Sequence, residues 1–263
     1  MTLRVTVLGC GSSGGVPLIG ERWGICDPKN PKNRRRRASI LLELADTSVL
    51  VDTGPDLRAQ INDLDRGEGG LQIDAVLYTH EHADHVSGID DIRFLAYSQN
   101  GQISAYAKDR CKDVLERRFD YIFKGIDGAK LSYPPIMKMH LWPDRLQVGS
   151  MTIDTWEQEH GDITSQGVRV GNFAYSTDIS NLSSSNLEAL IGIDTWIVGC
   201  IRKEPHPGHA SLDQIIKWAE VVQPRRLLFT HMTGLIDYDK WNAETPSNME
   251  CAYDGQVLEL PTQ

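Results

Sequence analysis

Three histidines and one aspartate fall within six positions of the chain, and this cluster restricts the fold more than any other segment. The residues are His80, His82, Asp84 and His85, and they follow an apolar run at 74–78 that is typical of a short β-strand. Imidazole and carboxylate groups together are ligands of zinc, iron and manganese. The spacing therefore predicts a metal site on a loop that a rigid strand holds in place. A polar turn with its histidines in solvent is the weaker interpretation, because clustered titratable groups usually mark a functional site.

The length and composition of the chain fit one soluble domain. Its 263 residues contain no Pro/Ser/Gly-rich linker, no low-complexity tract and no repeat, so we expect a single domain over residues 1–263. No stretch approaches about eighteen apolar residues, and residues 1–5 lack the features of a signal peptide. We therefore expect a cytoplasmic protein without membrane contact. The five cysteines are scattered and odd in number, which favours free thiols over a disulfide framework.

The charge of the chain argues against binding along polyanions. The formal net charge is −9, and nonspecific binding to nucleic acid depends on Lys and Arg that neutralise phosphates. We expect no stable nucleic-acid complex. The exception is local, because Arg34, Arg35, Arg36 and Arg37 are consecutive. Such a run is most often a solvated face. The alternative is a rim that gathers phosphorylated substrates, and the sequence leaves the role of this run open.

Hydrophobic patterns predict a mixture of hairpins and strand-helix pairs. Strands are predicted at residues 3–9, 39–44, 48–52, 74–78, 102–107, 151–157, 167–170, 172–176 and 226–230. Helices are predicted at residues 56–65, 89–97, 110–119 and 212–222, the last with the capping box of Ser211 and Gln214. Residues 120–145 carry no clear pattern. This mixture predicts two mixed sheets between helical layers, an α/β (α+β) architecture.

Three more side chains with metal-ligating chemistry follow apolar strands in the second half of the chain. They are His160, Asp178 and His231. Because strand ends converge on one edge of a sheet, we expect them to meet the histidines of the first cluster. A helix cap near Asn181 is the weaker interpretation of Asp178.

With these residues in place, the chain resembles the metallo-β-lactamase fold superfamily along essentially its whole length. The resemblance implies a four-layer αββα sandwich whose loops hold one or two metal ions at one edge. It implies a first metal at His80, His82 and His160, a second at Asp84, His85 and His231, and Asp178 as the bridge. Asp52 matches a family position behind the metal histidines, where a carboxylate can fix the tautomer of a ligand. A simple turn-former before Gly54 is an equal alternative for Asp52.

The implied ligand set suits an anionic substrate. Two divalent ions contribute +4, the two aspartates −2 and a bridging hydroxide −1, which leaves about +1 in the cleft. Such a pair of ions lowers the pKa of water, holds the hydroxide in line and stabilises charge on a phosphoryl oxygen. We therefore expect a phosphodiesterase with two divalent ions per chain that cleaves a small nucleotide or ribose phosphodiester, cyclic ones included. Zinc, manganese and iron all suit these ligands.

A narrower resemblance points to the branch that contains the phosphonate-pathway phosphoribosyl cyclic phosphodiesterase. The matching segments are Gly14-Gly15-Val16-Pro17, the arginine run before Ser39-Ile40, Asp52-Thr53-Gly54-Pro55-Asp56-Leu57 and Gly88-Ile89-Asp90-Asp91-Ile92-Arg93. In that branch a histidine in the segment 206–211 assists catalysis, which makes His209 the expected proton donor and His206 its rival. We therefore name Asp84 and His209 as the catalytic candidates.

His209 and Arg93 are the candidates for substrate contact. A guanidinium group suits bidentate recognition of phosphate, although a structural pair of Arg93 with Asp90 or Asp91 is an equal alternative.

One departure from that branch concerns a structural zinc. Many of its members carry a cysteine cluster after the Gly-Val-Pro segment, whereas residues 23–28 of this chain supply one thiol, Cys26. A site with three or four thiolates cannot form there, so we predict no structural zinc. A homodimer is suggested by the resemblance alone.

Other reactions of the superfamily are alternatives. A thioesterase of the glyoxalase II type uses the same seven ligands, but the segment around His209 and the early Gly-Val-Pro region argue against it. A tRNA-processing endoribonuclease is chemically closer, yet the chain has no long Gly/Pro/Lys-rich insertion. Outside the enzymes, a noncatalytic nucleotide-binding module is the alternative. We expect a small phosphorylated substrate such as a nucleotide or a ribose phosphate.

Overall fold

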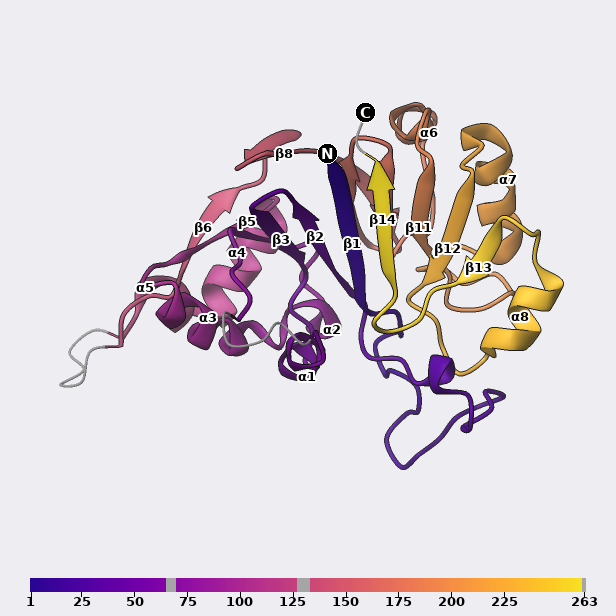
Figure 1. Ribbon diagram of the computed structural model, residues 1–263, viewed down its shortest axis with the longest axis horizontal. Coiled ribbons are helices and arrows are strands. Elements are labelled where there is room, and N and C mark those ends of the chain that lie inside the picture. The colour runs from indigo at the N-terminus through magenta and orange to yellow at the C-terminus, as the bar shows by residue number, and fades with distance from the viewer. Residues whose placement is uncertain (65–69, 127–132, 262–263) are drawn as a thin grey trace.

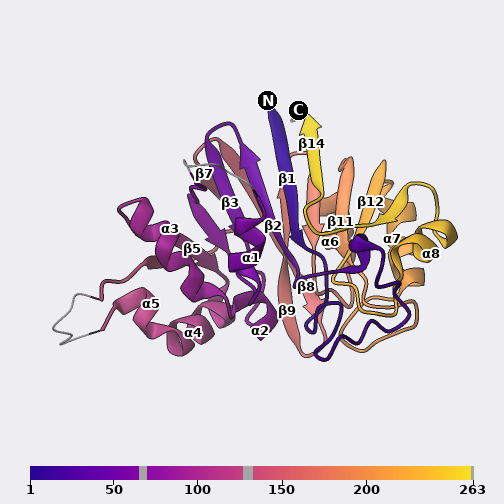
Figure 2. The ribbon, with the colours of Figure 1, turned by 60° about the horizontal axis from the view of Figure 1, so that its bottom comes forward.

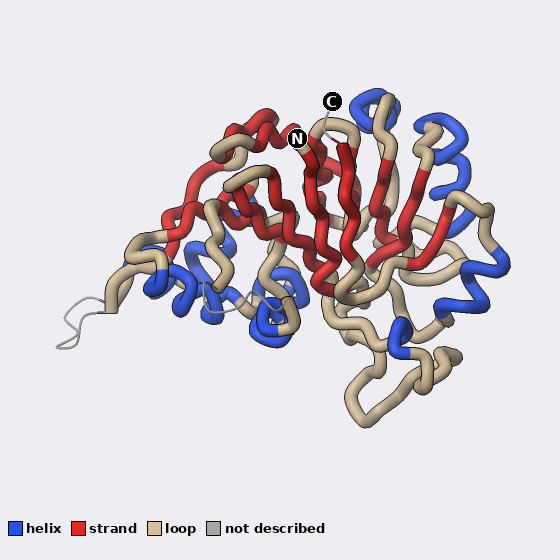
Figure 3. The backbone as a smooth tube through the Cα atoms, in the orientation of Figure 1, coloured by secondary structure: helices blue, strands red, loops and turns tan. Residues whose placement is uncertain are grey.

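The computed structural model describes residues 1–64, 70–126 and 133–261. Two seven-stranded sheets pack face to face, and helices cover the outer face of each sheet (Figure 1). The predicted αββα sandwich is therefore confirmed. Figure 3 shows the strands gathered in the middle of the molecule and the helices on its two outer sides.

The elements of the two sheets alternate with short helices along the chain. The strands are β1 (Thr2–Gly9), β2 (Ser39–Leu44), β3 (Thr47–Val51), β4 (Ala75–Leu77), β5 (Ile103–Ala107), β6 (Met137–Leu141), β7 (Arg145–Val148), β8 (Met151–His160), β9 (Ile163–Val170), β10 (Phe173–Ser176), β11 (Thr195–Gly199), β12 (Arg226–Thr230), β13 (Met249–Cys251) and β14 (Val257–Pro261). The helices are α1 (Leu57–Asn62), α2 (Ala83–Val86), α3 (Ile92–Ser98), α4 (Asp109–Arg118), α5 (Asp120–Lys124), α6 (Ser184–Leu190), α7 (Leu212–Val222) and α8 (Tyr238–Glu244), with 3-10 turns η1 (Pro31–Asn33) and η3 (Ile89–Asp91). None of the described helices is both long and apolar enough to cross a membrane.

Both sheets combine parallel and antiparallel pairs. The first sheet has the order β14-β1-β2-β3-β4-β5-β6, in which β3 to β6 are parallel neighbours. The second has the order β13-β12-β11-β10-β9-β8-β7, in which β10 to β13 are parallel neighbours. Parallel neighbours end at the same edge of a sheet, so the loops after β4, β10 and β12 can meet. Figure 2 shows these loops at the lower edge of the sandwich.

Two apolar clusters fill the sandwich. One lies between the sheets and beneath α7 and α8, and includes Val5, Phe173 and Trp196, each with no exposed surface. The other lies between the first sheet and the helices α1 to α5, and includes Leu50 and Tyr78. Sheets that are covered on both faces keep the strand ends rigid, which positions the loops at the edge.

The structure changes several predicted boundaries. Strand β8 continues through His160, because its pairing with β9 runs to the His160 and Ile163 pair at the hairpin end. His160, a predicted ligand, therefore ends a strand instead of following one. Helix α1 ends at Asn62, and the last predicted residue, Asp65, lies outside the described residues. The segment without a clear pattern contains α5 and β6.

Candidate metal centre

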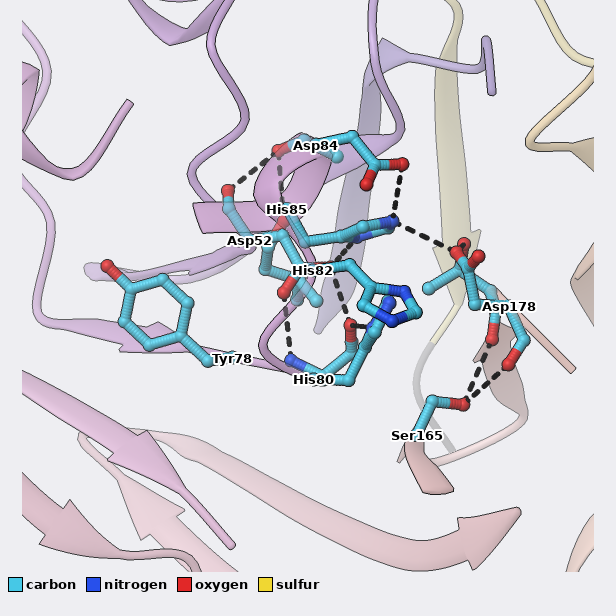
Figure 4. A network of polar contacts seen from close by, with 12 residues as sticks. Asp52, Tyr78, His80, His82, Asp84, His85, Ser165 and Asp178 are labelled. Carbon is cyan, nitrogen blue, oxygen red and sulfur yellow. Dashed lines mark hydrogen bonds and ion pairs between the residues drawn. The ribbon is translucent and has the colours of Figure 1, made fainter. Parts of the chain in front are cut away.

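The side chains that the sequence predicted as ligands meet at one edge of the sandwich. His80 and His82 lie in the loop after β4, and Asp84 and His85 lie in α2. His160 ends β8, while Asp178 and His231 follow β10 and β12. Figure 4 shows the first four of these residues pointing toward Asp178 from the opposite sheet. Segments up to about 150 residues apart in sequence thus contribute to one cluster, as the 147-residue separation of Asp84 and His231 illustrates.

One set of side chains, the first ligand group, consists of His80, His82 and His160. Their ligand atoms lie within 4.8 Å of one another. The Nε2 atom of His160 is 3.3 Å from Nδ1 of His82. The Nδ1 atom of His160 lies 2.6 Å from the carbonyl oxygen of Gly208, and Nδ1 of His80 lies 3.0 Å from the hydroxyl of Thr79. These partners leave Nε2 of His80 and of His160 facing the group.

The second ligand group consists of Asp84, His85 and His231, whose ligand atoms also lie within 4.8 Å of one another. The Nδ1 atom of His85 is 2.7 Å from a carboxylate oxygen of Asp52, which directs Nε2 of His85 into the group. Nε2 of His231 is 3.2 Å from the Asp84 carboxylate.

Asp178 lies between the two groups. Its Oδ2 atom is 3.0 Å from Nε2 of His85 and 3.3 Å from Nε2 of His231. Its Oδ1 atom is 3.6 Å from Nε2 of His160. One carboxylate oxygen therefore faces each group. The helix-cap alternative is excluded, because α6 is capped by Ser183.

Asp52 holds the loop of the first cluster from behind. It is fully buried and accepts hydrogen bonds from the backbone N–H and the hydroxyl of Thr79, both at 2.8 Å, besides its contact with His85. Its backbone is left-handed, with φ of 64°, so it also forms the turn before Gly54. Asp52 therefore both contacts the imidazole of His85 from behind and forms the turn before Gly54.

Thr79 and Gly208 also orient predicted ligands, namely His80 and His160. Neither residue was identified from the sequence. Gly208 acts through its backbone carbonyl, which every residue type has.

The carboxylates and imidazoles of the centre strongly affect each other's protonation. Burial alone would raise the pKa of Asp178, but His231 and His85 bring it well below its usual value. Burial alone would lower the pKa of His85, but Asp178 and Asp52 raise it well above its usual value. Burial lowers the pKa of His80 well below its usual value, which leaves a neutral imidazole. The buried carboxylates of Asp178 and Asp52 thus favour positive charge at His85.

The residues of the centre fit one or two divalent metal ions. The Nε2 atom of His80 is buried and has no hydrogen-bond partner among the described residues, and Nε2 of His85 has only the carboxylate oxygens of Asp178 and Asp84 beside it. Buried polar atoms without partners are costly unless something else binds them. Imidazoles and carboxylates are ligands that divalent ions prefer, and the outer nitrogens of His80, His85 and His160 have partners that fix the tautomer.

Of the two proton-donor candidates, His209 is the one beside the ligands. Its Nδ1 atom is 3.8 Å from Oδ1 of Asp178, and its ring stacks on that of His231 with centroids 5.3 Å apart. Burial, above all other influences, lowers the pKa of His209 to about 3. His206 lies farther out, and its Nδ1 atom accepts a hydrogen bond of 3.1 Å from the N–H of Gly208.

Arg93 lies on α3, away from both ligand groups. Its Nη2 atom is 3.1 Å from Asp90, and its guanidinium carbon is 4.4 Å from the ring centroid of Tyr133. It lines a cavity of about 650 Å³ between α1 and α3, and none of the lining residues is a ligand. The structural pair with Asp90 is therefore present, while contact of Arg93 with a substrate stays a prediction.

Comparisons with known proteins agree with this fold. A family model described as "Beta-lactamase superfamily domain" matches residues 47–232. A solved structure described as a "New Diphosphatase from the PhnP Family" is 32% identical, covers 99% of this chain and 98% of its own, and superposes with a TM-score of 0.87.

Two curated relatives carry other names. The Octanoyltransferase of Porphyromonas gingivalis is 29% identical over 260 residues, which is 96% of this chain and 51% of that protein. The Ribonuclease Z of a Bradyrhizobium species is 28% identical over 140 residues, which is 52% of this chain and 44% of that protein. The aligned part of this chain thus spans about half the length of these curated relatives.

Proposed function

This chain belongs to the beta-lactamase superfamily, and we propose that it is a binuclear metal-dependent phosphodiesterase acting on a small nucleotide or ribose phosphodiester. The family and the similar diphosphatase support a hydrolase with the metallo-β-lactamase fold. One observation supports the proposal of a two-metal phosphodiesterase in particular. Asp178 directs one oxygen toward each ligand group, as a carboxylate shared by two ions would.

In this proposal the first ligand group would hold one ion and the second ligand group the other, and the carboxylate of Asp178 would serve both groups. When bound, two divalent ions would supply Lewis acidity for a phosphoryl group and a lowered pKa for water. Zinc and manganese are the ions that we propose first, because both accept imidazole and carboxylate ligands.

We assign the proton donor for the leaving group to His209. Its ring lies beside Asp178 and His231, and the side chain is 14% exposed, so it borders both the ligands and solvent. Because the pKa of His209 is about 3, the imidazole is neutral near pH 7 until a nearby negative charge stabilises its protonated form. An anionic substrate supplies that charge. His206 supports the turn through Gly208 and does not reach the ligands in this arrangement.

The similarity to a diphosphatase favours a second candidate reaction, hydrolysis of a small diphosphate. The same residues would serve it, because a phosphodiester and a diphosphate both present a phosphoryl group with an oxygen leaving group.

A substrate panel tests the proposal. The protein, with manganese or zinc added, is offered a bis-aryl phosphodiester, a 2′,3′-cyclic nucleotide, a nucleoside diphosphate derivative, a glutathione thioester and an octanoyl thioester. We expect turnover of phosphorus esters and none of the thioesters. H160A should be inactive, whereas H140A should keep full activity, because His140 stacks on Tyr106 outside the centre.

The outcomes separate the candidates. Turnover of a thioester alone would refute the phosphodiesterase and support the thioesterase alternative. Turnover of the diphosphate alone would support the second candidate. Binding of nucleotides without any turnover would support a noncatalytic module.

His209 has its own test. The H209A variant should lose far more activity on a phosphodiester with an alkoxide leaving group than on one with nitrophenolate, since nitrophenolate leaves without a proton. The measurement is kcat/KM on the two substrates, with H206A as the matched control. Equal losses on both substrates would remove His209 as the proton donor.

A further inference from the structure

The four consecutive arginines do not form one cationic face. Arg34 is exposed and stacks on an indole ring, while Arg36 and Arg37 each pair with an aspartate on α1 or next to it. Arg35 differs from its neighbours, because only 1% of its surface is exposed. A guanidinium group is rarely buried to this extent, and burial is costly unless its donors are satisfied.

Both terminal nitrogens of Arg35 have acceptors, while its Nε atom has no hydrogen-bond partner among the described residues. Its Nη1 atom donates to the carbonyl oxygen of Ile236 at 2.7 Å and to that of Thr233 at 3.3 Å. Its Nη2 atom is 3.3 Å from the amide oxygen of Asn33, whose Nδ2 atom donates to Asp237 at 2.8 Å. Among the described residues, no carboxylate forms an ion pair with Arg35 itself. Its guanidinium group instead binds backbone carbonyls of the chain segment 231–237.

That segment, which we call the His231 turn, begins with a metal-ligand candidate in a strained conformation. The φ angle of His231 is 55°, a left-handed value that is unfavourable for residues other than glycine. Such a conformation persists when surrounding contacts impose it. The N–H of Met232 donates to the carbonyl of Cys10 at 2.8 Å, and Ser12 donates to that of Met232 at 3.0 Å. The loop of residues 10–38, which we call the early loop, therefore holds the turn from outside.

Further contacts tie the early loop to the same turn. The Cys26 thiol donates to the carbonyl of Ile236 at 3.2 Å, and the N–H of Ile25 donates to that of Gly234 at 2.8 Å. A Cβ atom at Gly24 would lie 2.2 Å from the carbonyl oxygen of Gly234, so the two backbones pack without room for a side chain. Figure 2 shows the segment after β1 beside the loops that follow β12. Hydrogen bonds and close backbone packing therefore connect the early loop to the His231 turn.

We infer that Arg35 is a positioning residue for the metal ligand His231. By drawing the carbonyls of Thr233 and Ile236 against the early loop, it imposes the turn that directs the imidazole of His231 toward Asp84 and Asp178. The inference rests on the binuclear centre proposed above. It assigns Arg35 to the second ligand group, because no contact of Arg35 reaches His80, His82 or His160 in the part of the chain that the structure describes.

Metal binding tests this assignment. The R35Q variant should bind one of the two ions about 10- to 100-fold more weakly, the usual effect of losing an outer partner of a ligand, and should bind the other ion as the natural chain does. The R35K variant should recover part of the affinity, since lysine keeps the charge but has one nitrogen in place of the two that reach the carbonyls and Asn33. R34Q is the matched control from the same run and should bind both ions normally. The measurements are chelator competition and the absorption spectrum of the cobalt-substituted protein.

A second measurement does not need metal. In metal-stripped protein, backbone amides of residues 232–237 should exchange with deuterium at least about 10-fold faster in R35Q and R35K than in R34Q, while amides of β8 near His160 should not change. If the natural chain binds only one ion, the binuclear proposal fails. The deuterium exchange of residues 232–237 still tests whether Arg35 positions the His231 turn. Equal weakening of both ions, or unchanged exchange in the His231 turn of R35K, would overturn the inference.

Discussion

The two ligand groups differ in what holds their imidazoles. In the second group a buried side chain, Asp52, orients His85, and a network of side chains around Arg35 supports the turn of His231. In the first group the backbone carbonyl of Gly208 orients His160, and the hydroxyl of Thr79 contacts His80. Side-chain partners can be removed by substitution, whereas a carbonyl moves only when the backbone moves. The second group therefore depends more on side chains elsewhere in the chain, whereas His160 of the first group depends on a backbone atom.

The largest loss of metal binding and activity is expected at Asp178, because its carboxylate faces both ligand groups. Asparagine at position 178 keeps the shape and tolerates the left-handed backbone, whose φ is 45°, but it lacks the negative charge. D178N should weaken binding of both ions and lower kcat/KM by more than about 100-fold, beyond the loss of an outer partner. Metal content and turnover measure this, with D162N in the turn after β8 as the control. Normal metal content in D178N would contradict a bridging role.

The second-largest effect is expected for D52N, which should change the affinity of one ligand group for its ion more than that of the other. D52N removes the charge behind His85, and we expect the affinity for one ion to fall by about 10- to 100-fold, with a smaller change for the other ion. Titration with zinc against a chelator resolves the two affinities. Equal losses for both ions would show that the groups are supported as one unit.

Support of the second group should also depend on pH through Asp254. This carboxyl accepts hydrogen bonds from the backbone N–H groups of Cys10 and Arg36, which lie in the early loop. Burial raises the pKa of Asp254 to about 6, from about 3.9 in the unfolded chain. Its contribution to stability is fully present below about pH 4 and is lost as the pH rises through 6.

The test of Asp254 uses metal-stripped protein, so that metal affinity does not contribute. Relative to D254N, the natural chain should lose about 2 kcal/mol of unfolding free energy between pH 4 and pH 7.5, since partial exposure screens some of the full effect. Denaturant unfolding at several pH values measures the difference. Parallel stability curves for the two proteins would contradict it.

The smallest effect is expected in the first group. H206A removes the acceptor for the N–H of Gly208, whose carbonyl orients His160, and should cost about 1 kcal/mol, or about fivefold in kcat/KM. The loss should be the same for alkoxide and nitrophenolate leaving groups. A loss that grows with the leaving-group pKa would instead make His206 the proton donor.

Much of the architecture was predictable because it depends on local patterns. The capping box of Ser211 and Gln214, the strands β2 and β3, and the apolar strands before His80, Asp178 and His231 appear close to their predicted positions, whereas β8 runs through His160. Strands β11, β13 and β14 were not predicted, and residues 120–145 gave no pattern. Strand β11 is buried at every position, so it has no alternation of polar and apolar residues to identify it, whereas β13 and β14 are short edge strands.

The chemistry of the site was determined by the sequence alone, because the types of ligand side chain and their order along the chain are local properties. The tertiary structure decided which partner each ligand received. The contacts of Gly208 with His160 and of Asp52 with His85 join distant segments, and one of them uses a backbone atom that every residue possesses. The same holds for the arginine run, in which four identical side chains have different environments. Burial of Arg35 arises from the packing of the early loop on the His231 turn, and residue type carries no information about such packing.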